Sequence, residues 1–167
     1  MSDLIVFRIV TQRHVADAFS GEGARLYGGR WNPKGIRVVY TASSRALAML
    51  EMLAQDQPLR AHYTIIPAAI PASIKVERLA LTKLPTDWAE SNQNETLRTI
   101  GADWINRSKA AVLCVPSAVV PSEFNYLLNP GHADFKRIKI GKAEIIKTDA
   151  RLIQKIADKT STSRRER

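Results

Sequence analysis

The chain has 167 residues, of which 45% are hydrophobic and 25% are charged, and its formal net charge is +9. This length suits one ordinary domain with a self-sufficient core, and the composition is typical of a soluble globular protein rather than a disordered or fibrous one. No apolar run approaches the roughly 18 residues that span a bilayer, and the N-terminus has no secretion signal. The lone Cys114 excludes an internal disulfide, so we expect a cytoplasmic protein.

Most of the excess positive charge lies near the end of the sequence. Residues 134–167 contain 11 Lys and Arg against 5 Asp and Glu, a net charge of +6. Residues 159–167 contain no apolar side chain and are expected to form a flexible basic tail after a single domain at 1–158. Such a tail attracts polyanions weakly or only improves solubility.

The first half of the chain predicts a strand, a glycine-rich segment, a second strand and a helix. Residues 4–10 are β-branched and aromatic, as in a strand, whereas 16–35 are expected to be mostly irregular. A short strand at 37–41 is followed by a helix through about Gln57, with Ser43 or Ser44 as its N-cap. The expected buried stripe of this helix comprises Ala46, Leu47, Leu50, Leu53 and Ala54, with Glu51 on its shoulder.

The second half predicts more strands and two further helices. Strands are expected at 62–70, 74–79, 110–115 and 136–147, with Pro67 indicating an edge position or a bulge. A helix is expected over 94–108, and a last helix after Asp149 with Leu152, Ile153 and Ile156 inward. The fold class is therefore a single α+β domain.

The glycine-rich segment is the clearest functional signal of the residues themselves. Five of the eight glycines lie between Gly21 and Gly35, and the run from Gly28 to Asn32 also contains Arg30 and Trp31. Clustered glycines permit tight turns or a close ligand, and a guanidinium favours an anionic one. We expect Trp31 itself to pack beneath the loop.

Conventional catalytic and metal signatures are missing. The sequence has neither a phosphate loop nor a nucleophile elbow, and its three histidines lie far apart, so we predict no metal site. Arg30, Tyr40 and Glu51 instead follow one another on a loop, a strand and a helix of one supersecondary unit. From the residues alone, a structural ion pair explains these three at least as well as a catalytic group does.

The chain resembles the RES domain family, which is named for an arginine, a glutamate and a serine. The resemblance extends to about residue 147 and rests on these stretches: Phe7-Arg8, 20–25, 28–32, 38–42, 47–51, 115–117 and 121–132. It implies a fold similar to ADP-ribosyltransferase toxins, with central mixed sheets flanked by short helices. It also implies a bacterial toxin that consumes NAD+ as a substrate, without a separate cofactor.

The same resemblance implies the site and the partner. Arg30, Tyr40 and Glu51 become the catalytic group, with Gly29, Ser117, Arg8 and Asn129 binding the dinucleotide. Arg8 could instead pair with a carboxylate, and Ser117 and Asn129 could be turn residues. The implied partner is an Xre-type antitoxin that blocks the active site and brings the toxin to DNA only indirectly, with oligomers possible in the complex and no membrane association.

Three functions stay open at this point. Glu51 would stabilise positive charge on the ribose while the nicotinamide leaves and water or phosphate attacks. Transfer of ADP-ribose to a protein differs from this only in the acceptor. A basic nucleic-acid-binding module without catalysis is the third, and it predicts binding that falls steeply with salt.

Overall fold

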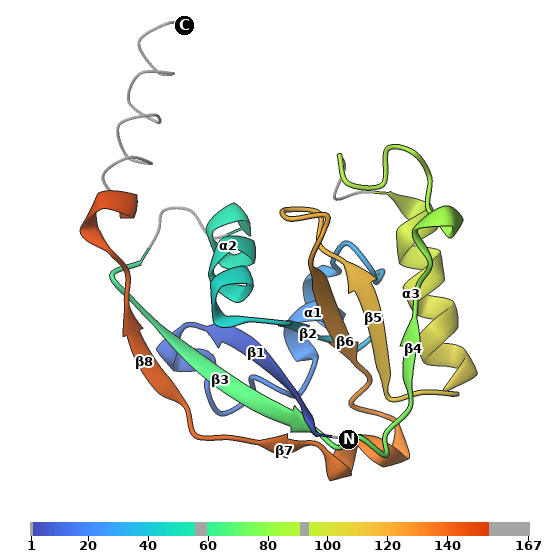
Figure 1. Cartoon of the computed structure of the whole chain (residues 1–167), viewed down its shortest axis with the longest axis horizontal. Coiled ribbons are helices and arrows are strands. Elements are labelled where there is room, and N and C mark those ends of the chain that lie inside the picture. Colours follow the sequence, from blue (N-terminus) through green and yellow to red (C-terminus); the bar gives the residue numbers. More distant parts are fainter. Residues whose placement is uncertain (1, 56–59, 91–93, 154–167) are drawn as a thin grey trace, which may run out of the picture.

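The computed structural model describes residues 2–55, 60–90 and 94–153. An eight-stranded sheet forms its centre, in the order β4-β5-β6-β2-β1-β3-β7, with β8 also paired to β3 (Figure 1). Its strands are β1 (Leu4–Val10), β2 (Val39–Ala42), β3 (His62–Ile70), β4 (Val76–Arg78), β5 (Val112–Pro116), β6 (Phe124–Leu128), β7 (Lys139–Ile140) and β8 (Glu144–Lys147). The helices are α1 (Glu22–Tyr27), α2 (Arg45–Gln55) and α3 (Glu95–Arg107), with 3-10 turns η1 (Gln12–His14), η2 (Leu81–Lys83) and η3 (Ala133–Arg137). Among the strands of the described residues, only β4 and β5 pair in parallel, so the predicted α+β class with a mixed sheet and short helices is confirmed.

The sheet is joined weakly at its middle. Strands β1 and β2 share a single residue pair, Phe7 with Ala42, whereas β1 pairs with β3 along its whole length and β2 with β6 along its own. In Figure 1, β1, β3 and β8 cross the left side obliquely, and β4, β5 and β6 stand upright on the right. The two halves therefore diverge at β1 and β2, and this divergence leaves room for a cavity.

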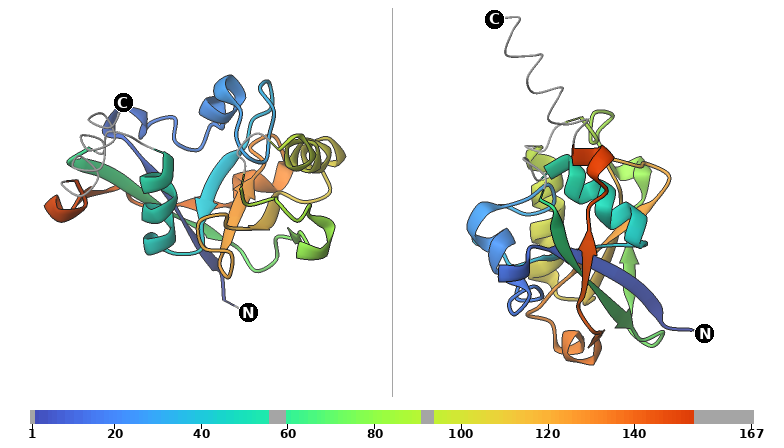
Figure 2. Two further views of the ribbon diagram at one scale, coloured as in Figure 1. Left: turned by 90° about the horizontal axis from the view of Figure 1, so that it is seen from above. Right: turned by 90° about the vertical axis from the view of Figure 1, so that its left-hand side faces the viewer.

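Helices cover the two halves separately, as both views of Figure 2 show. Helix α3 buries Leu97 and Trp104 against Leu113, Val115 and Leu127 of β5 and β6. Helix α2 buries Leu47 and Ala48 next to partly buried side chains of β1. A third apolar cluster lies between the halves and includes Val6, Val39, Ile66, Val112 and Leu128. These three clusters hold the sheet halves and α2 in fixed positions around the cavity.

Helix α3 begins and ends as the sequence predicts. Asn94 accepts hydrogen bonds from the backbone N–H groups of Thr96 and Leu97, and Ser108 ends the helix in the left-handed conformation. Gly101 lies within the unbroken helix, and a Cβ there would collide with the carbonyl oxygen of Trp31. The glycine thus lets α3 lie directly against the glycine-rich loop, and Trp31 is buried as expected.

Several sequence predictions need correction. Pro67 does not lie in an edge strand, since β3 pairs with β1 on one side and with β7 and β8 on the other. The pairing does shift by one residue opposite Pro67, between the pair Ile65–Glu144 and the pair Ala68–Ile140. The carbonyl of Pro67 accepts a hydrogen bond from Gly141 in the gap between β7 and β8, where a strand residue can lack an N–H. The predicted strand at 136–147 is instead the end of η3 followed by β7 and β8, and the irregular 16–35 segment contains α1.

The buried stripe of α2 is also rotated from the prediction. Leu47 and Ala48 are buried, whereas Ala46, Leu50 and Ala54 are exposed, because the helix covers only β1 and β2 on one side. This rotation moves Glu51 toward the sheet. Residues 150–153 are helical after Asp149, and the rest of the predicted last helix, Ile156 and the tail at 159–167 lie outside the described residues.

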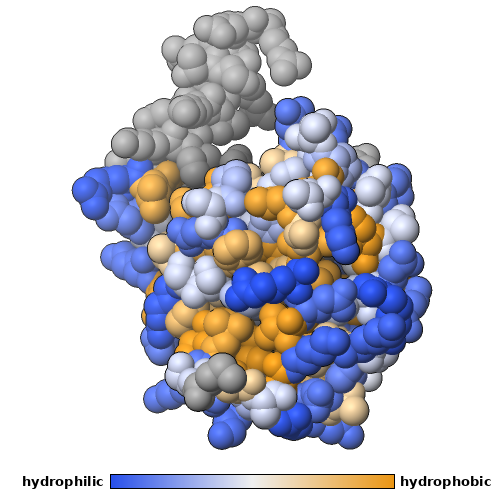
Figure 3. Space-filling view, turned by 45° about the vertical axis from the view of Figure 1, so that its right-hand side comes forward, coloured by the Kyte–Doolittle hydropathy of each residue, from blue (hydrophilic) through white to orange (hydrophobic). Residues whose placement is uncertain are grey.

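The surface of the described residues has both hydrophobic and hydrophilic areas. Figure 3 shows hydrophobic surface gathered in the middle of one side of the molecule and bordered by hydrophilic residues. Within residues 2–55, 60–90 and 94–153, no helix combines the length and the apolar character needed to cross a membrane.

Candidate active site

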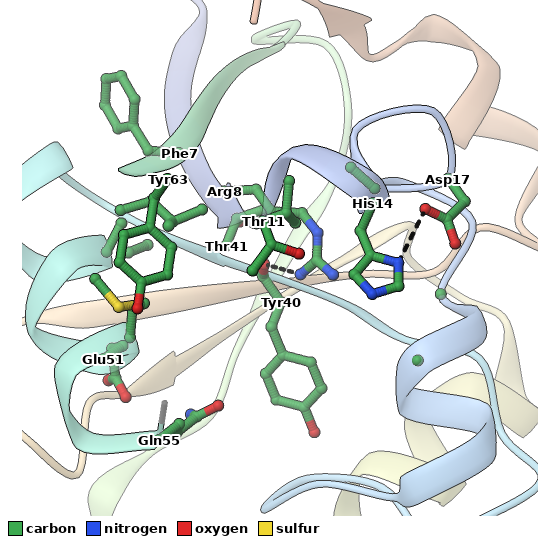
Figure 4. A pocket seen from close by; sticks show the side chains of 18 of the residues that line it. Phe7, Arg8, Thr11, His14, Asp17, Tyr40, Thr41, Glu51, Gln55 and Tyr63 are labelled. Carbon is green, nitrogen blue, oxygen red and sulfur yellow. Dashed lines mark hydrogen bonds and ion pairs between the residues drawn. The ribbon is translucent and has the colours of Figure 1, made fainter. Parts of the chain in front are cut away.

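A cavity of about 650 Å³ opens where β1 and β2 diverge, between α1 and α2 (Figure 4). This volume lies within the usual range of small-molecule sites. Its polar lining residues include Arg8, Thr11, Arg13, His14, Asp17, Glu22, Tyr40, Glu51, Arg60 and Asn125. Tyr40 and Glu51, two of the three residues predicted to be catalytic, therefore face one hollow.

Glu51 is held in place by two hydrogen bonds to one of its oxygens. Its Oε1 accepts from the hydroxyl of Ser117 at 2.7 Å and from Nδ2 of Asn125 at 2.6 Å. Ser117 is fully buried and its oxygen also accepts from the backbone N–H groups of Val119 and Val120, which fix its position. Both bonds end on Oε1, which leaves Oε2 for a ligand.

Helix α2 carries Glu51 one turn after Leu47, the residue that anchors the helix in the core. Ser44 caps the start of the helix by accepting a hydrogen bond from the N–H of Leu47 at 3.0 Å, as predicted. A carboxylate four residues after a buried leucine lies on the same face of a helix. Packing of Leu47 therefore sets the position of Glu51 relative to the sheet.

Tyr40 lies in a socket that the glycine-rich loop forms around its hydroxyl. The hydroxyl donates to Oδ1 of Asn32 at 2.7 Å and accepts from the N–H of Trp31 at 3.1 Å. Burial is the main cause that raises the pKa of Tyr40 well above its usual value, so the phenol is neutral. Because the hydroxyl is occupied, Tyr40 offers its ring rather than its oxygen to a ligand.

The loop itself is fixed by Asn32, which is completely buried. Its Nδ2 donates to the carbonyl oxygens of Ala24, Pro33 and Ile36 at 2.9, 2.9 and 3.1 Å. Gly29 completes the socket, because a Cβ at this position would lie 2.5 Å from the Tyr40 hydroxyl. Gly29 thus lies against Tyr40 and not in the cavity wall.

Arg8 supplies a cation to the cavity. One terminal nitrogen donates to the carbonyl oxygen of Tyr40 at 2.9 Å, where β1 and β2 separate, and Figure 4 shows the guanidinium in the middle of the site. Desolvation lowers the pKa of Arg8 to about 10, opposed by the nearby charge of Asp17. The side chain is therefore charged at neutral pH and poorly solvated by water, a state that favours an anionic ligand.

Arg30 lies near the other two predicted catalytic residues but outside the cavity wall. Its Nη1 donates to the carbonyl oxygen of Trp88 at 2.8 Å. Burial lowers the pKa of Arg30, and the charge of Glu51, followed by the interaction with Tyr40, raises it. The guanidinium, phenol and carboxylate are thus within electrostatic reach of one another.

Asn129 is not brought to this cavity. Its Oδ1 accepts a hydrogen bond from the N–H of Gly131 at 2.9 Å, which is a turn geometry, and it borders a separate hollow beside Ile36 and Arg37. Ser117 is buried and donates a hydrogen bond to Glu51. Sequence reasoning missed Asn125, although an asparagine inside a strand as apolar as β6 is unusual and signals a specific hydrogen bond.

Three buried side-chain atoms within the described residues have no hydrogen-bond partner. They are Nε of Arg8, Oγ1 of Thr11 and Oδ1 of Asn125, and all three residues line the cavity. Unpaired buried polar atoms are costly and rare in folded proteins. Their gathering around one hollow indicates a site shaped for a ligand with both anionic and hydrogen-bonding groups.

The fold and the site define a class: an α+β domain with a divided mixed sheet, a dinucleotide-sized cavity at the division, and a held carboxylate beside an arginine and a tyrosine. The family model "RES domain" matches residues 5–149. The chain belongs to the RES domain family, and the resemblance predicted from sequence is confirmed.

Two curated relatives match nearly the whole chain. "Toxin Res" of Photorhabdus laumondii is 37% identical over 154 residues, covering 90% of this chain and 98% of that protein. "Prs ADP-ribosylating toxin" of a Sphingobium species is 37% identical over 155 residues, covering 89% and 96%. "NAD(+) phosphorylase MbcT" of Mycobacterium tuberculosis is 38% identical over 92 residues, 53% of this chain and 50% of that protein.

A solved structure shares the fold. The crystal structure of the M. tuberculosis MbcT–MbcA toxin–antitoxin complex matches with a TM-score of 0.68 at 19% identity, covering 92% of this chain and 88% of the matched chain. At this identity, the match supports the fold assignment alone.

Proposed function

We propose that this protein is the toxin of a bacterial toxin–antitoxin pair and that it destroys NAD+ by breaking the bond between nicotinamide and ribose. The observation that carries the proposal is the carboxylate of Glu51, fixed by Ser117 and Asn125 at the wall of a dinucleotide-sized cavity. The printed names of the relatives, a toxin, an ADP-ribosylating toxin and an NAD(+) phosphorylase, support the same chemistry.

Glu51 provides the electrostatic part of the reaction. Departure of nicotinamide leaves positive charge on the ribose, in a transition state like that of glycoside hydrolysis. A preorganised carboxylate in a partly dry site stabilises such charge without reorganising. Oε2 of Glu51, free of the bonds that hold Oε1, also accepts a ribose hydroxyl.

Arg8 and Thr11 provide the phosphate site. Nε of Arg8 and the hydroxyl of Thr11 are buried donors without partners in the cavity, and a pyrophosphate has acceptors to satisfy both. We assign pyrophosphate binding to Arg8 rather than to Arg30, because Arg8 lines the cavity and Arg30 does not. Arg30 then acts beside Glu51, and the Tyr40 ring stacks on the nicotinamide.

The acceptor is water or phosphate. Water gives nicotinamide, ADP-ribose and a proton, whereas inorganic phosphate gives nicotinamide, ADP-ribose 1″-phosphate and a proton. Transfer of ADP-ribose to a protein is the second candidate, and the relative named Prs ADP-ribosylating toxin favours it. In each case NAD+ is a substrate and the protein needs no resident cofactor.

The partner is an antitoxin, as in the toxin–antitoxin complex with the same fold. We propose that it is of the Xre type, that it blocks the cavity, and that the pair acts on cytoplasmic NAD+ and reaches DNA through the antitoxin. The hydrophobic surface in Figure 3 is of the kind that partners cover.

The test is product identification. Purified protein is incubated with NAD+, with and without inorganic phosphate and with and without cell protein, and the products are separated by mass. Free nicotinamide together with ADP-ribose or its 1″-phosphate supports the proposal. ADP-ribose that is found only attached to cell protein selects the second candidate. NAD+ that stays intact in every incubation contradicts both candidates.

A further inference from the structure

We propose that Asn125 is a substrate-binding residue as well as a support for Glu51, and that its Oδ1 accepts a hydrogen bond from one hydroxyl of the nicotinamide ribose. This inference rests on the proposed function. The sequence offered no role for Asn125, and its two polar atoms have very different environments in the structure.

The orientation of the Asn125 amide is fixed by its neighbour. Its Nδ2 lies 2.6 Å from Oε1 of Glu51, a distance at which only an N–H facing the carboxylate is tolerated. The opposite orientation would place two oxygens in contact. Oδ1 is therefore the atom of the amide that does not face Glu51.

Oδ1 of Asn125 has no partner, although it is buried. The residue lines the cavity, and Oδ1 is one of the three unpaired buried side-chain atoms in the described chain. The other two, on Arg8 and Thr11, are donors suited to phosphate, whereas Oδ1 is an acceptor. The wall of the cavity thus has unpaired donors on Arg8 and Thr11 and an unpaired acceptor on Asn125, whose amide contacts Glu51.

Two neighbouring hydrogen-bond acceptors, one on the Asn125 amide and one on the Glu51 carboxylate, match the two adjacent hydroxyls of a ribose. Asn125 and Glu51 share a hydrogen bond, so Oδ1 of the amide and Oε2 of the carboxylate belong to neighbouring groups. Two adjacent hydroxyls of a ribose can donate one hydrogen bond to each of them. Filling both acceptors removes the cost of an unpaired buried oxygen and fixes the ribose relative to the bond that breaks.

The experiment pairs a protein variant with modified substrates. We would compare kcat/KM of the parent protein and Asn125→Ala on NAD+ and on analogues that lack the 2′- or the 3′-hydroxyl of the nicotinamide ribose. Loss of support for Glu51 weakens the hydrogen bond that Glu51 makes to its own ribose hydroxyl, so this part of the loss is measured separately with a second variant. If Oδ1 binds a hydroxyl, the loss on NAD+ should exceed the loss on one analogue by roughly 3- to 10-fold, as for one neutral hydrogen bond.

Ser117→Ala is the matched control. It removes the other donor to Oε1 of Glu51 but no acceptor in the cavity, so its loss should be smaller only on the analogue that lacks the hydroxyl bound by Glu51. The same pattern of losses in Ser117→Ala and Asn125→Ala would mean that Asn125 acts only through Glu51. If Asn125→Ala does not yield folded protein, judged by its thermal unfolding, Asn125→Ser serves in its place.

Equal losses on NAD+ and both analogues, from a parent that consumes NAD+, would overturn this inference alone. A parent protein that leaves NAD+ intact would overturn the proposed function and this inference with it. An analogue on which Asn125→Ala loses less activity than on NAD+ would identify, by the hydroxyl that it lacks, the one that Asn125 binds.

Discussion

The hydroxyl of Tyr40 donates a 2.7 Å hydrogen bond to Oδ1 of Asn32, which ties a strand residue to the glycine-rich loop. Through this bond and the one from Trp31, the loop determines how the Tyr40 ring lies in the cavity. The glycine-rich run with its tryptophan and asparagine therefore positions the Tyr40 side chain. It acts on a ligand only through Tyr40.

Tyr40→Phe should destabilise the protein, because Oδ1 of Asn32 and the N–H of Trp31 would then be buried without partners. We expect the free energy of unfolding to fall by about 1–3 kcal/mol, the usual cost of leaving a buried group unpaired. Denaturant unfolding measures this, with Tyr27→Phe as the control, since Tyr27 is 79% exposed. Equal stability of the two variants would show that the socket has no energetic importance.

Gly29→Ala should disturb the same socket from the other side. A Cβ would lie 2.5 Å from the Tyr40 hydroxyl, so the ring must shift, at a cost of about 1–3 kcal/mol of overpacking. Gly23→Ala is the control, because a Cβ there meets nothing within 4 Å and α1 should gain helix propensity. The two thermal midpoints should move in opposite directions, and a shared direction would contradict this account of Gly29.

Glu22 provides a pH-dependent contribution to stability at the wall of the cavity. Hydrogen bonds and charges of Arg25, followed by those of Arg37, lower the pKa of Glu22 below its usual value. A carboxylate with a lowered pKa in the folded state stabilises it above the pKa of the unfolded chain, and this stabilisation is lost as the pH falls through the folded pKa.

The thermal midpoint of Glu22→Gln should therefore lie below that of the parent near neutral pH, and the gap should close in acid, below about pH 4.5. Thermal unfolding across this range measures it. A gap that stays constant down to strongly acidic pH would mean that the ion pairs of Glu22 do not contribute.

Arg8→Lys should raise KM for NAD+ by about tenfold or more while the protein stays folded, because an ammonium cannot reproduce the fork that reaches both Tyr40 and a phosphate. Steady-state kinetics measures this. The control is Arg45→Lys, because Arg45 forms an exposed ion pair with Glu144 and neither residue lines the cavity. An unchanged KM for Arg8→Lys would place the pyrophosphate elsewhere.

The sequence predicts the elements with strong local signals. The structure has the predicted strands at 4–10 and 62–70 and the predicted helix after Asn94. Runs of β-branched residues and helix caps determine the conformation of their own segment, so they can be recognised without knowledge of the fold. The rotated stripe of α2 could not be predicted in this way, because which face of a helix is buried depends on how much sheet lies beneath it. The edge position expected for Pro67 was wrong for a similar reason, since a gap between two partner strands has no local signal.

The candidate site was predictable in part. Tyr40 and Glu51 could be proposed from their succession on one strand and helix, and the structure brings them to one cavity with Arg30 nearby. Asn125 could not be proposed as a site residue from the sequence, because its partner Glu51 is 74 residues away along the chain. Asn129 was predicted to bind the dinucleotide, yet only the fold shows that Asn125, and not Asn129, reaches the carboxylate.

The central claim is that Glu51 stabilises charge on the ribose, and the most direct measurement is the rate of NAD+ consumption by Glu51→Gln. A glutamine can still accept the hydrogen bonds from Ser117 and Asn125, so the site keeps its shape and loses only the charge. We predict turnover lower by roughly a hundredfold or more, with binding of NAD+ and thermal stability close to those of the parent. Equal turnover in the variant and the parent would contradict the account.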